Sequence, residues 1–133
     1  MGGKFGKGYL GIEAMTCVLY GIKNCDTVKK ARQWLAEHAI EYRFHDFRAD
    51  GLEAAQVAGW LQELGAEQLV NRRGTTWKQL DETTREGFSE ATAGALLLAN
   101  PTLIKRPLLD IGHQRFVGFS ADRYRDIFKQ HTL

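Results

Sequence analysis

The segment Thr16-Cys17-Val18-Leu19-Tyr20-Gly21 decides the fold class of this chain, together with the loop and helix pattern directly after it. It is a short apolar, β-rich run closed by a glycine, which predicts a buried strand over residues 17–20. The next residues, 22–27, form a polar loop that offers Asp26 or Thr27 as a helix N-cap. The apolar residues after this loop recur at helical spacing and predict a helix to about residue 38: Val28, Ala31, Trp34 and Leu35.

A second strand is predicted over residues 42–47, where apolar and polar residues alternate before the turn at Asp50-Gly51. Strand, helix and strand within about 30 residues form a βαβ unit. Its crossover should be right-handed and its two strands parallel. The N-terminal half of the chain therefore predicts a sheet with a helix packed on one face.

The remainder of the chain is expected to be helical in the middle and to end in a hairpin and a helix. A helix over residues 52–64 should stop at Gly65 and turn these residues inward: Ala54, Val57, Ala58, Leu61 and Leu64. Residues 66–99 show no strand pattern; 76–80 could form one helical turn, and Ser89 can cap a helix that ends before Asn100-Pro101. Residues 108–111 and 115–119 predict a hairpin. Ser120 should cap a last helix that buries Tyr124, Ile127 and Phe128.

Composition excludes several classes of protein. The chain has 133 residues, 44% of them hydrophobic and 26% charged, which suits one globular domain. No apolar run is long enough for a transmembrane helix, and a net charge of +2 offers no basic stripe for nucleic acid. Two cysteines provide no disulfide framework, so a cytoplasmic location is expected. We interpret residues 1–14 as an expression scar or an upstream extension, and residues 15–133 as a single domain.

Cys25 is the strongest candidate for a chemical role. It lies after a buried strand, in a polar loop, at the expected N-terminus of a helix. The unpaired N–H groups and the positive dipole end of a helix favour an anion there. A thiolate, which is the nucleophilic form of cysteine, is such an anion. Lys23 in the same loop adds positive charge. The alternative is a small buried hydrophobe, which the polar neighbours of Cys25 disfavour.

Cys17 has the opposite character, because it lies among the apolar residues of the first strand. A bridge to Cys25 is geometrically poor. The strand from Cys17 to Gly21 covers about 13 Å, whereas the Cα atoms of a disulfide lie within about 7 Å. Ile22 and Val28 occupy the positions where a CxxC partner of Cys25 would stand, so the chain has no dithiol redox motif.

Two basic clusters, Arg72-Arg73 and Lys105-Arg106, stand in predicted loops. Either cluster could be solvated surface, and either could bind an anionic substrate, because the planar guanidinium fits carboxylates and oxyanions. The four histidines are scattered along the sequence without metal-ligand spacing, so no metal site is expected.

Three segments together resemble the arsenate reductase (ArsC) and Spx family, most closely its YffB-type branch. Residues 19–31 resemble the active-site segment. The two later signatures are residues 71–81, which begin Asn71-Arg72-Arg73-Gly74-Thr75-Thr76, and Leu103-Ile104-Lys105-Arg106-Pro107-Leu108. The resemblance implies a thioredoxin-like α/β fold, with a mixed four-stranded sheet and a helical insertion between its βαβ and ββα halves. It also implies that Cys25 is the nucleophile, that Arg106 binds an anionic substrate, and that Pro107 is a cis proline facing the cysteine.

The resemblance also shows where this chain departs from its relatives. Arsenate reductases of the family use three arginines around the cysteine; Arg106 matches one, Arg72 or Arg73 matches a second with a shift, and Gly118 stands near the third. Spx-type regulators usually carry a CxxC pair, which this chain lacks.

These features lead to the hypothesis of a glutathione-dependent thiol reductase, with glutathione as co-substrate and a small oxidised thiol or an oxyanion as substrate. Besides Arg106 and Pro107, the residues expected to bind glutathione are Arg72, Arg73, Lys23 and Asn24. No bound cofactor, membrane or direct nucleic-acid partner is expected. The alternatives are an arsenate reductase and an Spx-type regulator that binds RNA polymerase without turnover.

Overall fold

A computed structural model describes residues 16–131 and contains one mixed sheet of four strands, in the order β3-β2-β4-β5. The strands are β2 (Val18–Gly21), β3 (Arg43–Asp46), β4 (Leu108–Asp110) and β5 (Arg115–Val117). β2 and β3 are parallel, while β4 is antiparallel to both β2 and β5. The predicted four-stranded mixed sheet of a thioredoxin-like fold is confirmed, with strand ends that differ from the expected ones by one or two residues.

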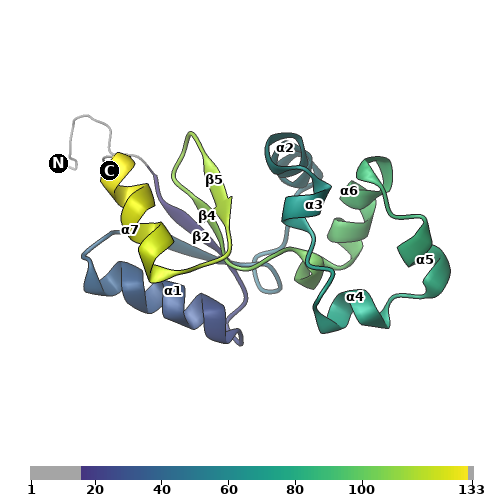
Figure 1. The fold of residues 1–133 in the computed structure, drawn as a ribbon, viewed down its shortest axis with the longest axis horizontal. Coiled ribbons are helices and arrows are strands. Elements are labelled where there is room, and N and C mark those ends of the chain that lie inside the picture. Colours follow the sequence, from purple (N-terminus) through teal and green to yellow (C-terminus); the bar gives the residue numbers. More distant parts are fainter. Residues whose placement is uncertain (1–15, 132–133) are drawn as a thin grey trace.

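The helices fall into two groups. Figure 1 shows α1 (Asp26–Glu37) and α7 (Ala121–Gln130) together beside the sheet. The other helices gather in a block at the opposite end of the molecule, called the helical block below. They are α2 (Ala54–Leu64), α3 (Ala66–Leu69), α4 (Thr75–Gln79), α5 (Glu82–Glu86), α6 (Glu90–Ala99) and the 3₁₀ turn η2 (Pro101–Leu103). Residues 66–99 add no strand to the sheet, as the sequence predicted.

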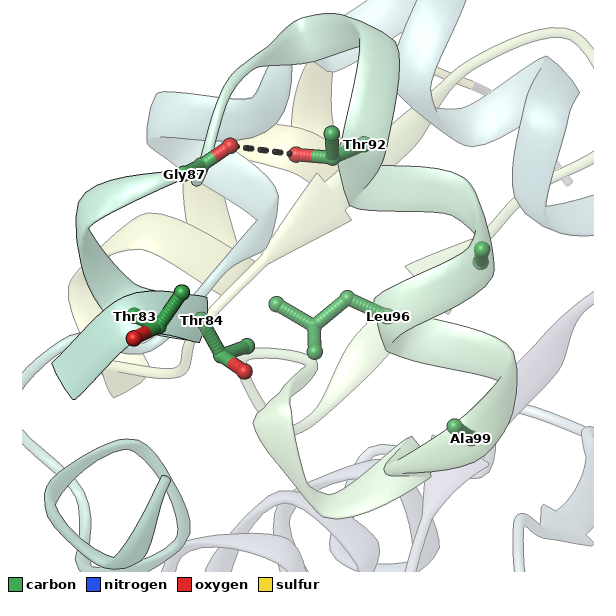
Figure 2. Close-up of a pocket in the computed structure, with 7 residues that line it drawn as sticks. Thr83, Thr84, Gly87, Thr92, Leu96 and Ala99 are labelled. Atoms are coloured by element: carbon green, nitrogen blue, oxygen red, sulfur yellow. Dashed lines mark hydrogen bonds between the residues drawn. The ribbon is translucent and has the colours of Figure 1, made fainter. Parts of the chain in front are cut away.

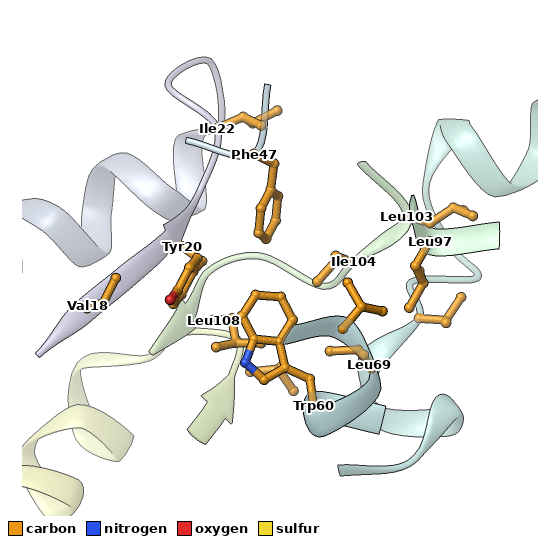
Figure 3. Packing of buried hydrophobic residues seen from close by; sticks show 13 residues of the cluster. Val18, Tyr20, Ile22, Phe47, Trp60, Leu69, Leu97, Leu103, Ile104 and Leu108 are labelled. Carbon is orange, nitrogen blue, oxygen red and sulfur yellow. The ribbon is translucent and has the colours of Figure 1, made fainter. Parts of the chain in front are cut away.

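The alternation of side chains along β2 separates two hydrophobic cores. Val18 and Tyr20 point into a core shared with the helical block, and Figure 3 shows Trp60 of α2 packed in it near Tyr20 and Leu108. Leu19 and the preceding Cys17 point to the other face, where α1 and α7 cover the sheet. Successive residues of a strand face opposite sides, so a four-residue strand contributes to both cores.

The predicted burial is confirmed on α1 and partly wrong on α2. All four apolar residues predicted inward on α1 are buried. On α2, however, Ala54 and Ala58 are exposed, while Val57 and Trp60 are buried. The indole of Trp60 removes far more apolar surface from water than two alanine methyl groups, so the helix turns that side to the sheet.

The two serine caps predicted from the sequence are confirmed. Ser89 accepts the N–H of Thr92 at the start of α6, and Ser120 accepts the N–H of Arg123 at the start of α7. Tyr124 and Ile127 are buried on α7, and Phe128 is half-buried. The interpretation of residues 1–14 lies outside the described residues. Within residues 16–131, no helix has the length and apolar character that a membrane span requires.

Candidate active site

Cys25 is the N-cap residue of α1. Its backbone is extended (φ −138°, ψ 120°) and its carbonyl oxygen accepts the N–H of Lys29 at 2.9 Å. No side chain accepts a hydrogen bond at this cap, so the first-turn N–H groups of α1 lack a side-chain acceptor. The prediction of Asp26 or Thr27 as N-cap is wrong by one or two residues, because the chain is still extended at Cys25 and helical from Asp26 onward.

The approach of the chain to Cys25 depends on a glycine at the end of β2. A Cβ atom on Gly21 would lie 2.7 Å from Cγ2 of Val28, which is buried on the first turn of α1. Only a residue without a side chain allows this close approach. Ile22 is then buried, while Lys23 and Asn24 are exposed and Cys25 is half-buried. The thiol therefore lies at the surface of the rigid junction between strand and helix.

Asp46, for which the sequence patterns predicted no role, supports the loop that carries Cys25. It is 6% exposed, and its Oδ2 accepts the backbone N–H of Lys23 at 3.2 Å. Its Oδ1 accepts the N–H groups of Arg48 and Ala49 at 2.7 and 3.1 Å. The sequence contains one signal for this residue: the carboxyl ends of parallel strands meet at one edge of a sheet, which places the end of β3 beside the loop after β2.

These contacts determine the ionisation of Asp46. Burial raises the pKa of the Asp46 carboxyl, but the N–H donors of Ala49, Arg48 and Lys23 lower it more, so the net pKa lies below its usual value. A carboxyl whose pKa is lower in the folded than in the unfolded chain stabilises the fold above its unfolded pKa of about 3.9. This stabilisation is lost as the pH falls through the folded pKa.

Replacing this carboxylate tests its role in stability. We expect Asp46→Asn to lower the free energy of unfolding at pH 7 by about 1.5–3 kcal/mol, because an amide nitrogen would face the N–H of Lys23. The difference from wild type should shrink as the pH falls below about 3.9, the pKa of the carboxyl in the unfolded chain, toward the lower folded pKa of Asp46. Urea unfolding at pH 7 and below about pH 4 measures this difference in the free energy of unfolding. Asp122→Asn, at an exposed carboxylate, is the control. A loss that stayed constant across this pH range would contradict the electrostatic part of the argument.

Cys17 lies on the other side of the sheet from Cys25. It is 4% exposed and belongs to the core under α1 and α7, whereas Cys25 packs against the core shared with the helical block. Burial, with a smaller effect of the Asp110 carboxylate, raises the pKa of the Cys17 thiol to about 11. Both cysteines are free thiols. The core role predicted for Cys17 is consistent with its burial and its raised pKa.

Arg106 and Pro107 stand at the same end of the sheet as Cys25. β4 is antiparallel to β2 with Tyr20 opposite Leu108, so residues just before Leu108 lie beside the residues that leave β2 toward Cys25. The peptide bond between Arg106 and Pro107 is cis, as predicted. The Pro107 carbonyl accepts the N–H of Gly118 at 2.9 Å. The cysteine loop and the segment around the cis proline therefore converge on one edge of the sheet.

The guanidinium of Arg106 is only partly used by the protein. Its Nη1 donates to the carbonyl oxygen of Thr102 at 2.7 Å, and its Nε is buried without a hydrogen-bond partner among the described residues. Nη2 makes no hydrogen bond within residues 16–131. A half-buried arginine with an unused donor edge is suited to an anionic ligand, which would supply the acceptors that the protein does not.

The second predicted cluster is placed differently. Arg72 forms an ion pair with Glu67 at 3.1 Å, and its guanidinium lies 4.7 Å from the ring centre of Phe88 and 5.3 Å from that of Trp77. Its side chain is thus engaged within the helical block. Arg73 is exposed, and its backbone N–H donates to Oδ1 of Asn71 at 3.0 Å. Of the two arginines, Arg73 is the one whose side chain forms no ion pair within residues 16–131.

Two other features lie outside this edge of the sheet. Figure 2 shows a pocket of about 400 Å³ between α5 and α6, lined by Thr83, Thr84, Gly87, Thr92, Ala95, Leu96 and Ala99. None of these side chains is titratable, and Cys25 is not among them. His113 and His131, far apart in sequence, meet at 3.1 Å between ring nitrogens. No cluster of three or more metal-ligating side chains occurs within residues 16–131.

The cysteine loop and the cis proline both lie within a stretch of this chain that matches a known protein family. The profile of the ArsC family matches residues 20–127, which include both segments. The chain belongs to the ArsC family. The family resemblance inferred from the three sequence segments is thereby confirmed.

The relatives of this ArsC-family protein cover nearly its whole described length. It is 46% identical over 110 residues to an uncharacterised protein of Haemophilus influenzae, covering 83% of this chain and 96% of that one. A solved structure named YffB protein is 48% identical, covers 84% of this chain and 97% of its own, and superposes with a TM-score of 0.80. A solution structure of an arsenate reductase (ArsC) related protein from Brucella melitensis is 44% identical. It covers 90% of this chain and 99% of its own, with a TM-score of 0.72.

Proposed function

We propose that this ArsC-family protein is a cytoplasmic, glutathione-dependent thiol reductase with a single nucleophilic cysteine. One observation carries the proposal: Cys25 is a half-buried thiol at the N-cap of α1, while Cys17 is buried on the opposite face of the sheet. The N-cap position places the Cys25 thiol beside first-turn N–H groups that lack a side-chain acceptor. Cys17 and Cys25 are the two cysteines of the sequence, so with Cys17 buried on the opposite face the thiol that resolves an intermediate on Cys25 comes from outside the protein.

The first step is a thiol–disulfide exchange. The Cys25 thiolate attacks the glutathionyl sulfur of a mixed disulfide between glutathione and a small thiol. A new bond forms between Sγ of Cys25 and that sulfur while the original disulfide breaks. The small thiol leaves as its thiolate and takes a proton from solvent. Cys25 then carries the glutathionyl group, and the substrate has been reduced.

A second glutathione completes the cycle. Its thiolate attacks the glutathionyl sulfur bound to Cys25, releases the Cys25 thiolate and forms oxidised glutathione. Two electrons thus pass from glutathione to the substrate in each turnover, and the protein returns to its initial state. The chain needs no bound cofactor for this reaction, because glutathione itself is the reductant.

Residues of the cysteine loop and of the two basic clusters supply binding. Arg106 holds a carboxylate of glutathione through the donors that Thr102 leaves unused. Lys23 and Asn24, exposed in the loop before Cys25, approach the backbone of the same ligand. Arg73 contributes charge, since Arg72 is occupied by Glu67 and the aromatic rings of the helical block. The backbone around Pro107 offers an extended edge for the disulfide-bearing part of the substrate.

A panel of oxidants tests the proposal. Wild-type protein and glutathione should reduce the mixed disulfide of glutathione and 2-mercaptoethanol, monitored as oxidised glutathione formed. Arsenate should give little turnover, because Gly118 stands near the place of the third arginine used by the family's arsenate reductases. Turnover of arsenate with glutathione, without reduction of the mixed disulfide, would favour the arsenate-reductase alternative. Co-elution with the C-terminal domain of the RNA polymerase α subunit, without any turnover, would favour the Spx-type alternative.

A further inference from the structure

Two hydrogen bonds connect helix α4 of the helical block to the guanidinium of Arg106. The hydroxyl oxygens of Thr76 and Thr102 lie 2.8 Å apart, and the carbonyl oxygen of Thr102 accepts Nη1 of Arg106 at 2.7 Å. We propose that Thr76 is a positioning residue that orients Arg106 toward the glutathione carboxylate by fixing Thr102. This inference rests on the function proposed above, in which Arg106 binds that carboxylate.

The local backbone explains why the carbonyl of Thr102 is free to hold Arg106. In the turn η2, Leu103 and Ile104 donate their N–H groups to carbonyls three residues earlier. The next donor in this series, Lys105, turns away and donates instead to the carbonyl of Leu69 at 2.8 Å. The Thr102 carbonyl therefore loses its usual 3₁₀ partner and accepts the guanidinium of Arg106.

Main-chain contacts hold Leu103 and Ile104 of this segment, and a side-chain contact holds Thr102 from α4. Val70 and Ile104 form an isolated antiparallel bridge, and Asn71 donates its N–H to the carbonyl of Leu103 at 2.8 Å. Among the hydrogen bonds within residues 16–131, the side-chain contact to Thr76 is the one that joins Thr102 to α4. The N–H of Leu103, bonded to Asn100, holds the peptide that carries the Thr102 carbonyl, and the hydroxyl of Thr76 adds a second anchor for this carbonyl and for the guanidinium it accepts.

A tight turn also positions Thr76. A Cβ atom on Gly74 would lie 2.8 Å from Nδ2 of Asn71, so the amide of Asn71 folds over a position that only glycine fills without a shift. Gly74 is the N-cap of α4, and Thr76 lies in the first turn of that helix. The segment from Asn71 to Thr76 thus contributes to the site through a threonine hydroxyl, whereas the side chain of Arg72 is engaged elsewhere.

The energetic reason is the flexibility of arginine. A free Arg side chain loses rotamer entropy when it binds a carboxylate, and prior orientation reduces this loss. A neutral hydrogen bond contributes about 0.5–1.5 kcal/mol, which corresponds to a change in affinity of about two- to tenfold. Thr76→Val keeps the shape of the side chain and removes its hydroxyl. We expect it to weaken ligand binding by about this factor.

The test uses S-methylglutathione, which has both carboxylates of glutathione and cannot form a disulfide. Calorimetry on the full chain should show binding to wild type, weaker binding to Thr76→Val, and near wild-type binding to Thr76→Ser, which restores the hydroxyl. Thr75→Val is the matched control, because Thr75 is exposed on the same turn and its side chain makes no hydrogen bond within residues 16–131. Equal weakening by Thr75→Val and Thr76→Val would overturn the proposal.

A double-mutant cycle separates positioning from general packing. The readout is the second-order rate constant for transfer of glutathione from oxidised glutathione to Cys25, which remains measurable when binding is weak. Thr76→Val should lower this constant in the wild-type background and leave it unchanged in the Arg106→Ala background, because the group being positioned is then absent. A loss of the same factor in both backgrounds would show a purely structural role and overturn the proposal.

The outcomes also distinguish this inference from the proposed function. If S-methylglutathione binds, and Thr76→Val weakens it only when Arg106 is present, the positioning role stands even if no oxidant of the panel is turned over. If wild type does not bind S-methylglutathione, Arg106 is not a glutathione site and the positioning role is overturned. If wild type turns over an oxidant of the panel and Thr76→Val binds S-methylglutathione as tightly as wild type, the reductase function stands and the positioning role of Thr76 is overturned.

Discussion

Cys25→Ser is expected to lower glutathione-dependent turnover on the order of 10³-fold or more, to the background of the uncatalysed exchange. A serine hydroxyl at the N-cap of α1 is not ionised at neutral pH, so it provides no nucleophile for a disulfide sulfur. It is also a good N-cap, which accepts a first-turn N–H and should preserve or raise the stability of the fold. The loss of activity can therefore be assigned to chemistry rather than to unfolding.

Steady-state assays of wild type, Cys25→Ser and Cys17→Ala measure this effect side by side. Cys17→Ala removes a thiol from the core under α1 and α7, so it should cost some stability and leave turnover nearly intact. Thermal unfolding of all three proteins controls for folding. Substantial turnover in Cys25→Ser, or its loss in a folded Cys17→Ala, would refute Cys25 as the single nucleophile.

Oxidised glutathione should leave one glutathionyl group on Cys25 and no bridge between the two cysteines. The thiols occupy opposite faces of the sheet, so a bridge would require β2 to leave the core. With a pKa of about 11, the Cys17 thiol is ionised to only about one part in ten thousand at pH 7, and the thiolate is the attacking form. We therefore expect external glutathione, and not Cys17, to release the glutathionyl group from Cys25.

Intact-mass analysis and peptide mapping decide this point. Wild type and Cys17→Ala should both show a single glutathione adduct at Cys25, and Cys25→Ser should show none in the folded state. The adduct should disappear when reduced glutathione is added, with release of oxidised glutathione. A main product without the glutathione adduct, and lighter than the reduced protein by the hydrogens of its two thiols, would indicate a disulfide between Cys17 and Cys25. That result would support a mechanism with two cysteines.

Patterns along the chain were sufficient for the elements around Cys25. The 3.6-residue period of Val28, Ala31, Trp34 and Leu35 predicted the buried face of α1 because a helix repeats its contacts locally. The loop between strand and helix likewise predicted that Cys25 stands at a helix N-terminus. Only the identity of the cap was missed. The chain turns helical one residue after Cys25, and cap preferences cannot distinguish neighbouring polar residues of one loop.

The buried face of α2 could not be predicted in the same way. A stripe through Ala54 and Ala58 fits helical spacing as well as the observed face through Val57 and Trp60. The choice depends on what the helix packs against, and the receiving surface is formed by Tyr20 and Phe47 from the first part of the chain. The spacing of apolar residues along α2 does not tell which face of the helix packs against those two rings.

The sequence by itself determined the fold class, the strand–loop–helix junction and the cysteine at its end, because strand and helix periods and capping signals are local. Tertiary structure decided the partners of the polar groups outside this junction. Asp46 meets Lys23 across 23 residues, Thr76 meets Thr102 across 26, and Arg72 is drawn to Glu67 and Phe88 instead of the site. Hydrogen bonds and ion pairs act over about 3–4 Å, so these partners exist only after strand register and helix packing bring distant segments together.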